Sequence, residues 1–283
     1  MEFSSLLKSI SSKSAFASTT FKMANVSGGT HILSGEESQR LRNYCTSESY
    51  SAADLDNYAR LLHEPAEKIR ANFEDRVKAT DIDKARQALA DIQYGPTKVP
   101  LFNYILQLTI LNPPQRVRCI ETARYLALGA KVPVDTTDLS GTTAFMYSIS
   151  TKPYWDREFA DIMLEASAAV NHRNRYGGVA GHDIVMARDV SPAGKMKTLE
   201  ALKYFVEKGG DVNIADGDGV TVKRIGTSVD RMIQGIGAII NGGTGAEGLN
   251  NLASAVGGGK KIGRNDPCHC SSKKKFKVCC GKV

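Results

Sequence analysis

Apolar residues recur at intervals of three and four between polar ones from Ser34 to about Ile92, the spacing that gives an α-helix one buried face. Ser34-Gly-Glu-Glu begins the first such stretch with acids in its first turn, where the helix dipole favours negative charge. Ser51-Ala-Ala-Asp has the spacing of a capping box, and apolar residues at helical intervals follow it from Leu55 to Leu62. Residues 34–92 are therefore predicted to form three or four short helices.

A six-residue pattern recurs three times in the middle of the chain, with Asp or Asn first, Gly fourth and Thr or Val sixth. Its copies are Asp138-Leu-Ser-Gly141-Thr-Thr143, Asn174-Arg-Tyr-Gly177-Gly-Val179 and Asp216-Gly-Asp-Gly219-Val-Thr221. Asp or Asn followed by Gly shapes a tight loop. Each copy is therefore expected to carry the chain from one helix pair to the next.

The helices that precede these turns are expected to end at a regular distance from them. The interval is seven residues from Ser167 to Asn174, and again from Gly209 to Asp216. A small residue at such a point takes the left-handed backbone of a helix C-cap. An earlier helix, ending at Gly129, leads into the first turn with two extra residues.

The apolar residues between the turns, such as Ile162 and Leu202, cannot be buried by one helix pair alone, so neighbouring pairs are expected to stack. On these residues, the segment from about 94 to 225 resembles an ankyrin repeat array. The usual signature of that family is Asp-x-x-Gly-x-Thr-Pro-Leu-His, then two helices, then Leu-Leu-x-x-Gly-Ala-Asp-Val-Asn. The resemblance implies a helical solenoid that presents a surface to a protein partner and has no chemistry of its own.

The match to this signature is degenerate. The nearest forms of Thr-Pro-Leu-His are Val99-Pro100-Leu101-Phe102 and Thr143-Ala144-Phe145-Met146. The glycine turns lie farther apart than the roughly 33 residues of the family, and the surplus maps to residues 151–156 and 190–195, between the two helices of a repeat. The alternative is an unrelated helical bundle in which the turns coincide by chance. After Val222 the pattern fades, and Met232 to Ile240 is expected to form one more helix that caps the array.

The composition, with 42% apolar and 24% charged residues, is that of an ordinary soluble protein. No stretch approaches the roughly 18 consecutive apolar residues of a membrane span, so a cytoplasmic protein is expected, with nuclear or organellar placement left open. Residues 1–33 are expected to be disordered. These residues are rich in Ser, Ala and Lys, a composition that is also compatible with a transit peptide, so a transit peptide is the alternative to disorder.

The net positive charge of the chain comes entirely from its C-terminal end. Residues 260–283 hold eight Lys or Arg and the single acid Asp266, a net charge of +7, which equals the +7 of the whole chain. The preceding 259 residues are therefore neutral, and only the tail has the charge of a polyanion-binding segment.

Four of the six cysteines lie within thirteen residues of this tail, at Cys268, Cys270, Cys279 and Cys280. Four thiolates at such density suit the tetrahedral preference of Zn²⁺, so these residues are predicted to hold one structural zinc ion. A disulfide knot or an unstructured basic tail is the alternative, and His269 is a possible competing ligand. Cys45 and Cys119 are isolated, and are expected to be buried or semi-buried thiols.

Residues Gly263 to Gly281 closely resemble the SEC-C motif, the zinc knuckle at the C-terminus of the bacterial translocation ATPase SecA. The family form is Gly-Arg-Asn-Asp-Pro-Cys-Pro-Cys-Gly-Ser-Gly-Lys-Lys-Tyr-Lys-Lys-Cys-Cys-Gly, and its ligand positions carry over to the same four cysteines. His269, Ser271 and Lys273 depart from it. The resemblance implies an acidic protein or a ribosomal surface as the partner of the tail.

The sequence thus predicts a mostly α fold, a degenerate ankyrin-repeat solenoid with an N-terminal helical region and a small C-terminal zinc knuckle. The expected divisions are residues 1–33, the helical region 34–92, the array 93–240, a Gly-rich linker 241–260 and the SEC-C motif 261–283. The predicted function is that of a non-enzymatic adaptor. The alternative is a nucleic-acid or ribosome-binding protein that uses the basic tail.

Candidate partner-binding residues follow from this interpretation. Trp155 and Tyr154 fall in the insertion between two helices, where they are either exposed interface anchors or ordinary packing residues. Lys273, Lys274 and Lys275 form the basic run of the knuckle. His172 and His182 lie within a repeat, where structural hydrogen bonds are a more common role for His than catalysis.

Replacement of Cys279 and Cys280 by Ser is expected to abolish zinc binding by the tail, because two thiolates cannot close a tetrahedral site. The zinc content of the purified protein, measured by plasma mass spectrometry, checks this. Unchanged zinc in the double variant would contradict the ligand assignment.

Overall fold

The structure is a computed structural model that describes residues 31–151, 154–186 and 189–242. The chain divides into two units, Met1–His31 and Ile32–Val283, and the elements described here belong to the second. The expected linker and the SEC-C segment lie outside the described residues, apart from Asn241 and Gly242. None of the helices in the described ranges has the length and apolar character needed to cross a bilayer.

The helical character predicted for residues 34–92 is confirmed. The helices are α1 (Gly35–Ser47), α2 (Asn57–Leu61), α3 (Ala66–Ala79) and α4 (Ile82–Ala90), with a short 3-10 turn at Ala52–Asp54. The Ser34 hydroxyl accepts from the Glu37 N–H, and the Glu37 carboxylate accepts from the Ser34 N–H, so a capping box fixes the start of α1. A second box at Ser51 and Asp54 begins the 3-10 turn, and α2 starts separately at the N-cap Asp56.

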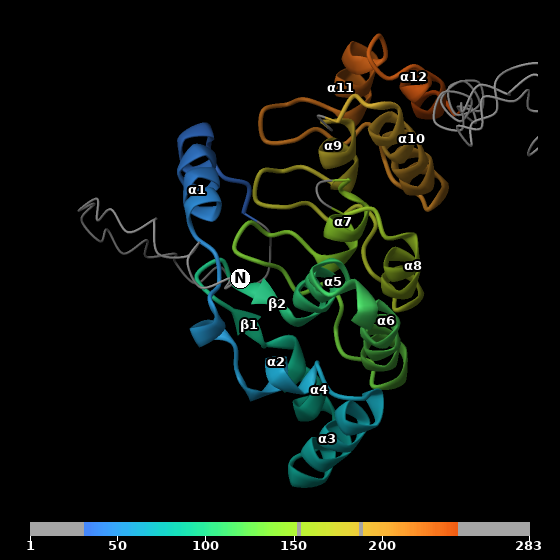
Figure 1. Cartoon of the computed structure of the whole chain (residues 1–283). Helices are drawn as coiled ribbons and strands as arrows, with labels where there is room; N and C mark the ends of the chain where they lie inside the picture. Colours follow the sequence, from blue (N-terminus) through green and yellow to red (C-terminus); the bar gives the residue numbers. More distant parts are fainter. Residues whose placement is uncertain (1–30, 152–153, 187–188, 243–283) are drawn as a thin grey trace, which may run out of the picture. The chain divides into compact units, whose positions relative to one another are not determined.

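Four helix pairs follow, and the first begins with a hairpin of β1 (Gln93–Tyr94) and β2 (Val99–Pro100). The pairs are α5 (Leu101–Leu111) with α6 (Arg116–Arg124), α7 (Ala144–Ile149) with α8 (Arg157–Glu165), α9 (Ala180–Val185) with α10 (Pro192–Glu207), and α11 (Val222–Val229) with α12 (Ile236–Ile240). The first helices form one column and the second helices another (Figure 1). This stacked arrangement is the helical solenoid that the repeated turns predict.

Each of the three repeated turns is built by one side-chain oxygen that accepts two backbone N–H groups. The Oδ1 atom of Asp138 accepts from Ser140 and Thr142, both at 2.9 Å. That of Asn174 accepts from the residues two and four positions later, both at 3.0 Å, and that of Asp216 accepts in the same way at 3.0 and 2.9 Å. The fourth residue of each turn is a glycine with φ of +73 to +77°, a conformation that costs glycine little.

The seven-residue interval upstream of the turns holds for all three copies. Ser167 (φ 69°) and Gly209 (φ 91°) have the left-handed backbone expected of them. In the first copy, this conformation is taken by Lys131 (φ 57°), seven residues before the Asp138 turn, and not by Gly129. The two extra residues expected there are absorbed by a π-helical turn, Tyr125–Gly129, that extends the end of α6.

Neighbouring turns are joined by backbone hydrogen bonds along their tips. The Arg175 N–H donates to the Ser140 carbonyl at 2.9 Å, and the Gly217 N–H donates to the Tyr176 carbonyl at 2.8 Å. Behind the tips, one continuous core runs through the helices, with fully buried residues such as Phe145 and Phe205. Each repeat is therefore held to the next both by its turn and by its helices.

The end of the array differs from the expectation. The pattern was predicted to fade after Val222, yet Val222–Val229 forms α11, whose N-cap Thr221 accepts from the Arg224 N–H. Its partner α12 covers only the second half of the predicted helix. Close packing binds the two together, because a Cβ added at Gly226 would lie 2.1 Å from a methyl carbon of Ile240. Within the described residues, the array thus includes a complete fourth pair.

Replacement of Asn174 by Ala is expected to lower the free energy of unfolding by about 2–4 kcal/mol, because it leaves two backbone N–H groups without an acceptor in a site where Asn174 is only 6% exposed. Urea unfolding followed by circular dichroism measures this. Asn174→Asp keeps an acceptor oxygen, as at Asp138, and should lose less. Equal losses in the two variants would show that the side-chain acceptor does not hold the turn.

Candidate functional site

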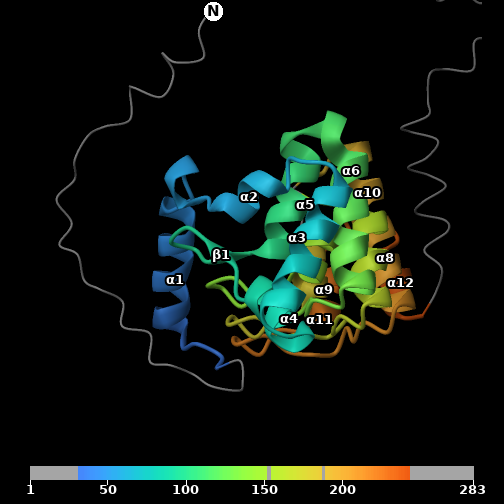
Figure 2. The same ribbon diagram turned by 90° about the horizontal axis from the view of Figure 1, so that it is seen from below.

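Helix α1 lies along the tips of the repeat turns, beside the array and not within it (Figures 1 and 2). The Leu33 N–H donates to the Arg175 carbonyl at 2.9 Å, which adds the chain before α1 to the row of bonded turn tips. The Arg42 guanidinium lies over the Tyr176 ring, 4.6 Å from its centroid. Leu41, at 2% exposure, is the residue of α1 that is buried.

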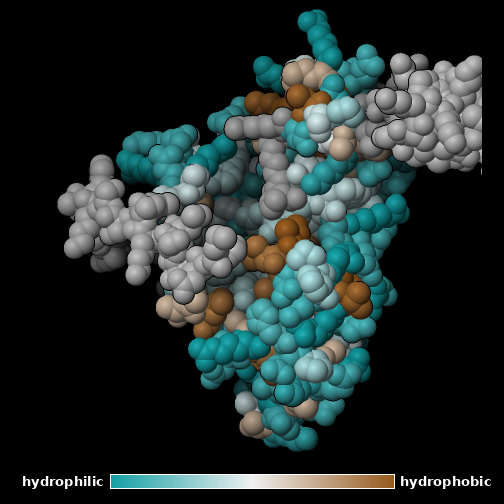
Figure 3. Space-filling view, viewed as in Figure 1, coloured by the Kyte–Doolittle hydropathy of each residue, from teal (hydrophilic) through white to brown (hydrophobic). Residues whose placement is uncertain are grey.

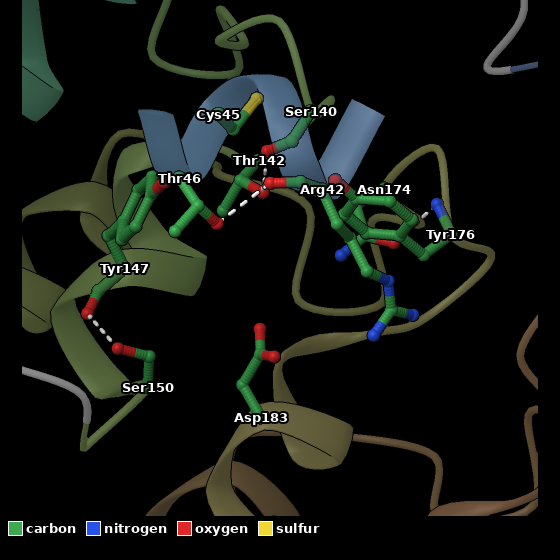
Figure 4. A pocket seen from close by; sticks show the side chains of 10 residues that line it. All are labelled: Arg42, Cys45, Thr46, Ser140, Thr142, Tyr147, Ser150, Asn174, Tyr176 and Asp183. Carbon is green, nitrogen blue, oxygen red and sulfur yellow. Dashed lines mark hydrogen bonds between the residues drawn. The ribbon is translucent and has the colours of Figure 1, made fainter. Parts of the chain in front are cut away.

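A cavity of about 320 Å³ separates α1 from the array, and we call it the α1 groove. Its walls come from α1, from the first two repeat turns, and from the inner helices α7 and α9 (Figure 4). Most of the lining side chains are polar. They include Arg42, Cys45, Ser140, Tyr147, Tyr176 and Asp183.

The turn residue Asp138 forms a hydrogen-bonded pair with Tyr147, which lines the groove. The Tyr147 hydroxyl donates to Oδ2 of Asp138 at 2.9 Å, while Oδ1 also accepts from the Ser140 hydroxyl at 2.6 Å. Loss of solvent raises the pKa of Asp138, although these donors oppose the shift. Burial, together with the Asp138 charge, raises the pKa of Tyr147 well above its usual range. The pair therefore lies in the wall behind the groove, where the Asp138 carboxyl already accepts from Ser140, Thr142 and Tyr147.

Cys45 projects from α1 toward the same place and is half-buried, as expected for an isolated thiol. Burial raises its pKa, and the Asp138 charge raises it further. Cys119 is buried in the array, and its pKa is also raised by burial. Both groups are thiols and not thiolates at neutral pH, so neither is an activated nucleophile.

A second cavity, of about 180 Å³, adjoins the first and shares Cys45, Ser140 and Tyr147 with it. Its wall includes Asn103, which is 2% exposed. The amide nitrogen of Asn103 donates to the Thr142 carbonyl at 3.4 Å, which fixes the orientation of the amide. The Oδ1 atom of Asn103 has no hydrogen-bond partner, so a buried acceptor remains unsatisfied beside this cavity.

The two aromatic residues proposed as exposed anchors pack against the array. Tyr154 is buried at 9% exposure, its ring 6.3 Å from that of Tyr147, and burial raises its pKa to about 12. The Trp155 indole packs edge-on to Tyr204 and donates to Glu200 at 3.2 Å. Ordinary packing accounts for Tyr154. Trp155 is half-buried, and its contact with a partner stays a prediction.

The two histidines of the array join successive repeats. His172 Nε2 lies 3.0 Å from the Gly141 carbonyl oxygen, and His182 Nε2 lies 3.0 Å from that of Val220. The Val179 N–H donates to Nδ1 of His182 at 3.1 Å, at the start of α9. These hydrogen bonds support the structural role expected of both residues.

The predicted zinc ligands Cys268, Cys270, Cys279 and Cys280 lie outside the described residues, as do Lys273, Lys274 and Lys275. Within the part of the chain that the structure describes, no group of three or more His, Cys, Asp or Glu is placed to hold a metal ion. The donor set of the tail, four thiols at close spacing in the sequence, fits zinc by its chemistry.

Comparison with known proteins identifies the tail. Residues 264–282 match the SEC-C motif. Protein translocase subunit SecA of Finegoldia magna is 60% identical over 35 residues, which are 12% of this chain and 4% of that protein. The same subunit of Thermodesulfovibrio yellowstonii is 78% identical over 23 residues, 8% of this chain and 3% of that protein. The chain thus spans only a few per cent of the length of these relatives.

Among solved structures, the crystal structure of EF0377, an ankyrin repeat protein, is similar to 69% of this chain and to 100% of that chain. The TM-score is 0.45 and the sequence identity is 15%. The description of the array as a helical solenoid rests on its own turns, caps and stacked helix pairs.

The α1 groove was not predicted from the sequence. The part of its wall that comes from the turns consists mostly of Ser, Thr and Asn side chains, which in sequence indicate only loops. Two sequence features bear on this groove, the weak apolar face of residues 35–47 and Arg42 within that segment. Neither feature specifies a contact with a distant part of the chain.

Replacement of Arg42 by Ala is expected to speed amide hydrogen exchange in α1 by about threefold to tenfold, because it removes a cation–π contact of roughly 0.5–1 kcal/mol and the side-chain packing beneath it. Exchange read by mass spectrometry measures this. Arg40→Ala is the matched control, since Arg40 pairs with Glu36 on the exposed side of the same helix. Equal effects of the two changes would contradict docking through Arg42.

Proposed function

We propose that this protein is a non-enzymatic adaptor, in which the repeat array binds one protein and the zinc-binding tail docks to a second. The observation that carries the proposal is the combination, in one chain, of a stacked helical array with a SEC-C motif at residues 264–282. Stacked repeats present extended surfaces suited to protein contact. Zinc, when bound, would cross-link the four tail cysteines and give a short basic segment a defined surface.

Exposed apolar side chains on the array support a protein partner. Ile110 and Leu111 at the end of α5, and Val117 at the start of α6, are 45%, 70% and 68% exposed. Apolar residues interrupt a mostly hydrophilic face in Figure 3. Clustered exposed apolar residues mark protein contacts more often than single ones do.

The state of the titratable groups supports a role other than catalysis. The pKa of Cys45 and that of Cys119 are raised, and His172 and His182 hydrogen-bond to the turns. Neither cysteine has the thiolate form that nucleophilic catalysis needs.

The tail supplies a docking segment whose charge is opposite to that of an acidic protein or a ribosomal surface. Its net charge is +7, and the segment between the array and the knuckle is rich in glycine. A Gly-rich tether gives a second binding event a high effective concentration once the first partner is held. A cytoplasmic site of action is part of this proposal.

The same charge favours a second candidate function, the binding of RNA or DNA through phosphate contacts. Such binding must weaken steeply as salt rises, because counterions are released from the nucleic acid. The tail has one aromatic residue, Phe276, so sequence-specific stacking is not expected. Lack of RNA or DNA affinity at low salt would exclude this second function.

Truncation of the chain after Gly259 is expected to remove the partners that dock to the tail and to keep those of the array. Pull-down of the intact and the truncated protein from the same lysate, followed by mass spectrometry, measures this. The intact Cys279→Ser, Cys280→Ser variant is the matched control, because it keeps the basic charge and removes only the ligands. Identical partner sets for all three would contradict recruitment by the tail.

A further inference from the structure

We propose that α1 occupies the partner-binding surface of its own array, and that the partner displaces it with a helix that carries basic side chains. This inference rests on the proposed role of the array in binding a protein. It assigns the α1 groove as the site and gives the partner a definite chemistry.

Few buried residues attach α1 to the array. Of its 13 residues, Leu41 is buried, whereas eight of the 11 residues of α5 are buried. Leu33, just before the helix, and the contact of Arg42 with Tyr176 add to this attachment. A helix of this length is marginal in water once it leaves its packing partner. Helix α1 can therefore open locally while the core of the array stays folded.

The fit of α1 to the array is also incomplete. Cavities of about 320 and 180 Å³ remain beneath it, on either side of Cys45. Beside the smaller one, the Oδ1 atom of Asn103 lacks a donor. A partner that places a donor there would recover the free energy that this unsatisfied acceptor costs.

The charges that face the groove favour a cation. The Asp183 carboxylate from α9 reaches into it, and the Glu48 carboxylate lines the smaller cavity. Arg42, which comes from α1 itself, is the cationic side chain among the lining residues. Acidic walls disfavour a nucleic acid, so the geometry favours a protein helix with Arg or Lys.

The positions of those basic residues follow from α1. One basic residue of the partner would take the position of Arg42, over the Tyr176 ring. Cys45, one turn later on the same face, borders both cavities, so a Lys at this place would put its ammonium near Asn103 and Asp138. The chemistry of the partner is therefore a helix with Arg and Lys three residues apart.

The test uses the full-length protein and a labelled, capped synthetic peptide with the sequence of residues 34–47 and Cys45→Lys. Leu41→Ala in the protein loosens α1 by removing its buried side chain. Fluorescence anisotropy should show the peptide binding at least about tenfold more tightly to this variant than to the wild type, because more of the protein is open. A peptide with Arg42→Glu and Cys45→Glu should not bind.

Two further variants keep the test decisive. Cys45→Lys within the protein should strengthen the docking of α1, so it should slow exchange in α1 and weaken peptide binding below that of the wild type. Arg42→Ala opens α1 without a buried cavity, and replaces Leu41→Ala if circular dichroism shows that the latter is unfolded. Arg40→Ala should bind the peptide as the wild type does.

The proposal is overturned if the basic peptide binds no better to variants in which hydrogen exchange shows an open α1. It is also overturned if Leu41→Ala forms dimers by exchange of α1, since the groove would then select a second copy of this chain. In either case, recovery of partners in the pull-down with the intact protein would still support the adaptor function. An array that recovers no partner in any variant would instead remove the adaptor function.

Discussion

The turn in which one Asp or Asn oxygen accepts two backbone N–H groups is the interaction on which the rest of the array depends. At Asp138, Asn174 and Asp216 it fixes the loop with the same two bonds. A loop fixed in this way starts the next inner helix at a constant place and sets its tip beside the tip before it. The Arg175 carbonyl, exposed along this row, is the acceptor to which the chain before α1 binds at Leu33. The α1 groove thus exists because the turns are regular.

These turns were also the part of the fold that local sequence could specify. The Asp or Asn, the glycine and the capping residue act within six positions of one another, so their spacing is visible without knowledge of the rest of the chain. The left-handed residue of the first copy was missed because Lys131 pays a conformational cost that glycine avoids, and the surrounding packing must meet it. Helix α11 was missed because Gly226 and four β-branched residues within it lower its helix propensity, while contact with α12 supplies its stability.

The candidate site lies at the other extreme, because its contacts join positions far apart in the chain. Residue types alone could predict the four tail cysteines as zinc ligands, since such a prediction needs only the right donors at close spacing. The docking of α1 rests on the burial of Leu41 and on Arg42, which lies over the Tyr176 ring more than a hundred residues away. A single apolar residue on a polar helix carries no local sign of what it will contact.

Burial of apolar surface explains only part of why α1 lies where it does, because Leu33 and Leu41 are the buried apolar residues of this segment. The groove is walled by Ser, Thr, Tyr and Asp side chains that water would solvate well, so solubility does not require a cover. A tethered helix has an effective concentration in about the millimolar range, so a partner with the same contacts as α1 would displace it only at comparable concentration. A partner at lower concentration must bind the open array more tightly than α1 does, through contacts that α1 leaves unmade. The unsatisfied oxygen of Asn103, beside Cys45, is such a contact, and it calls for a hydrogen-bond donor.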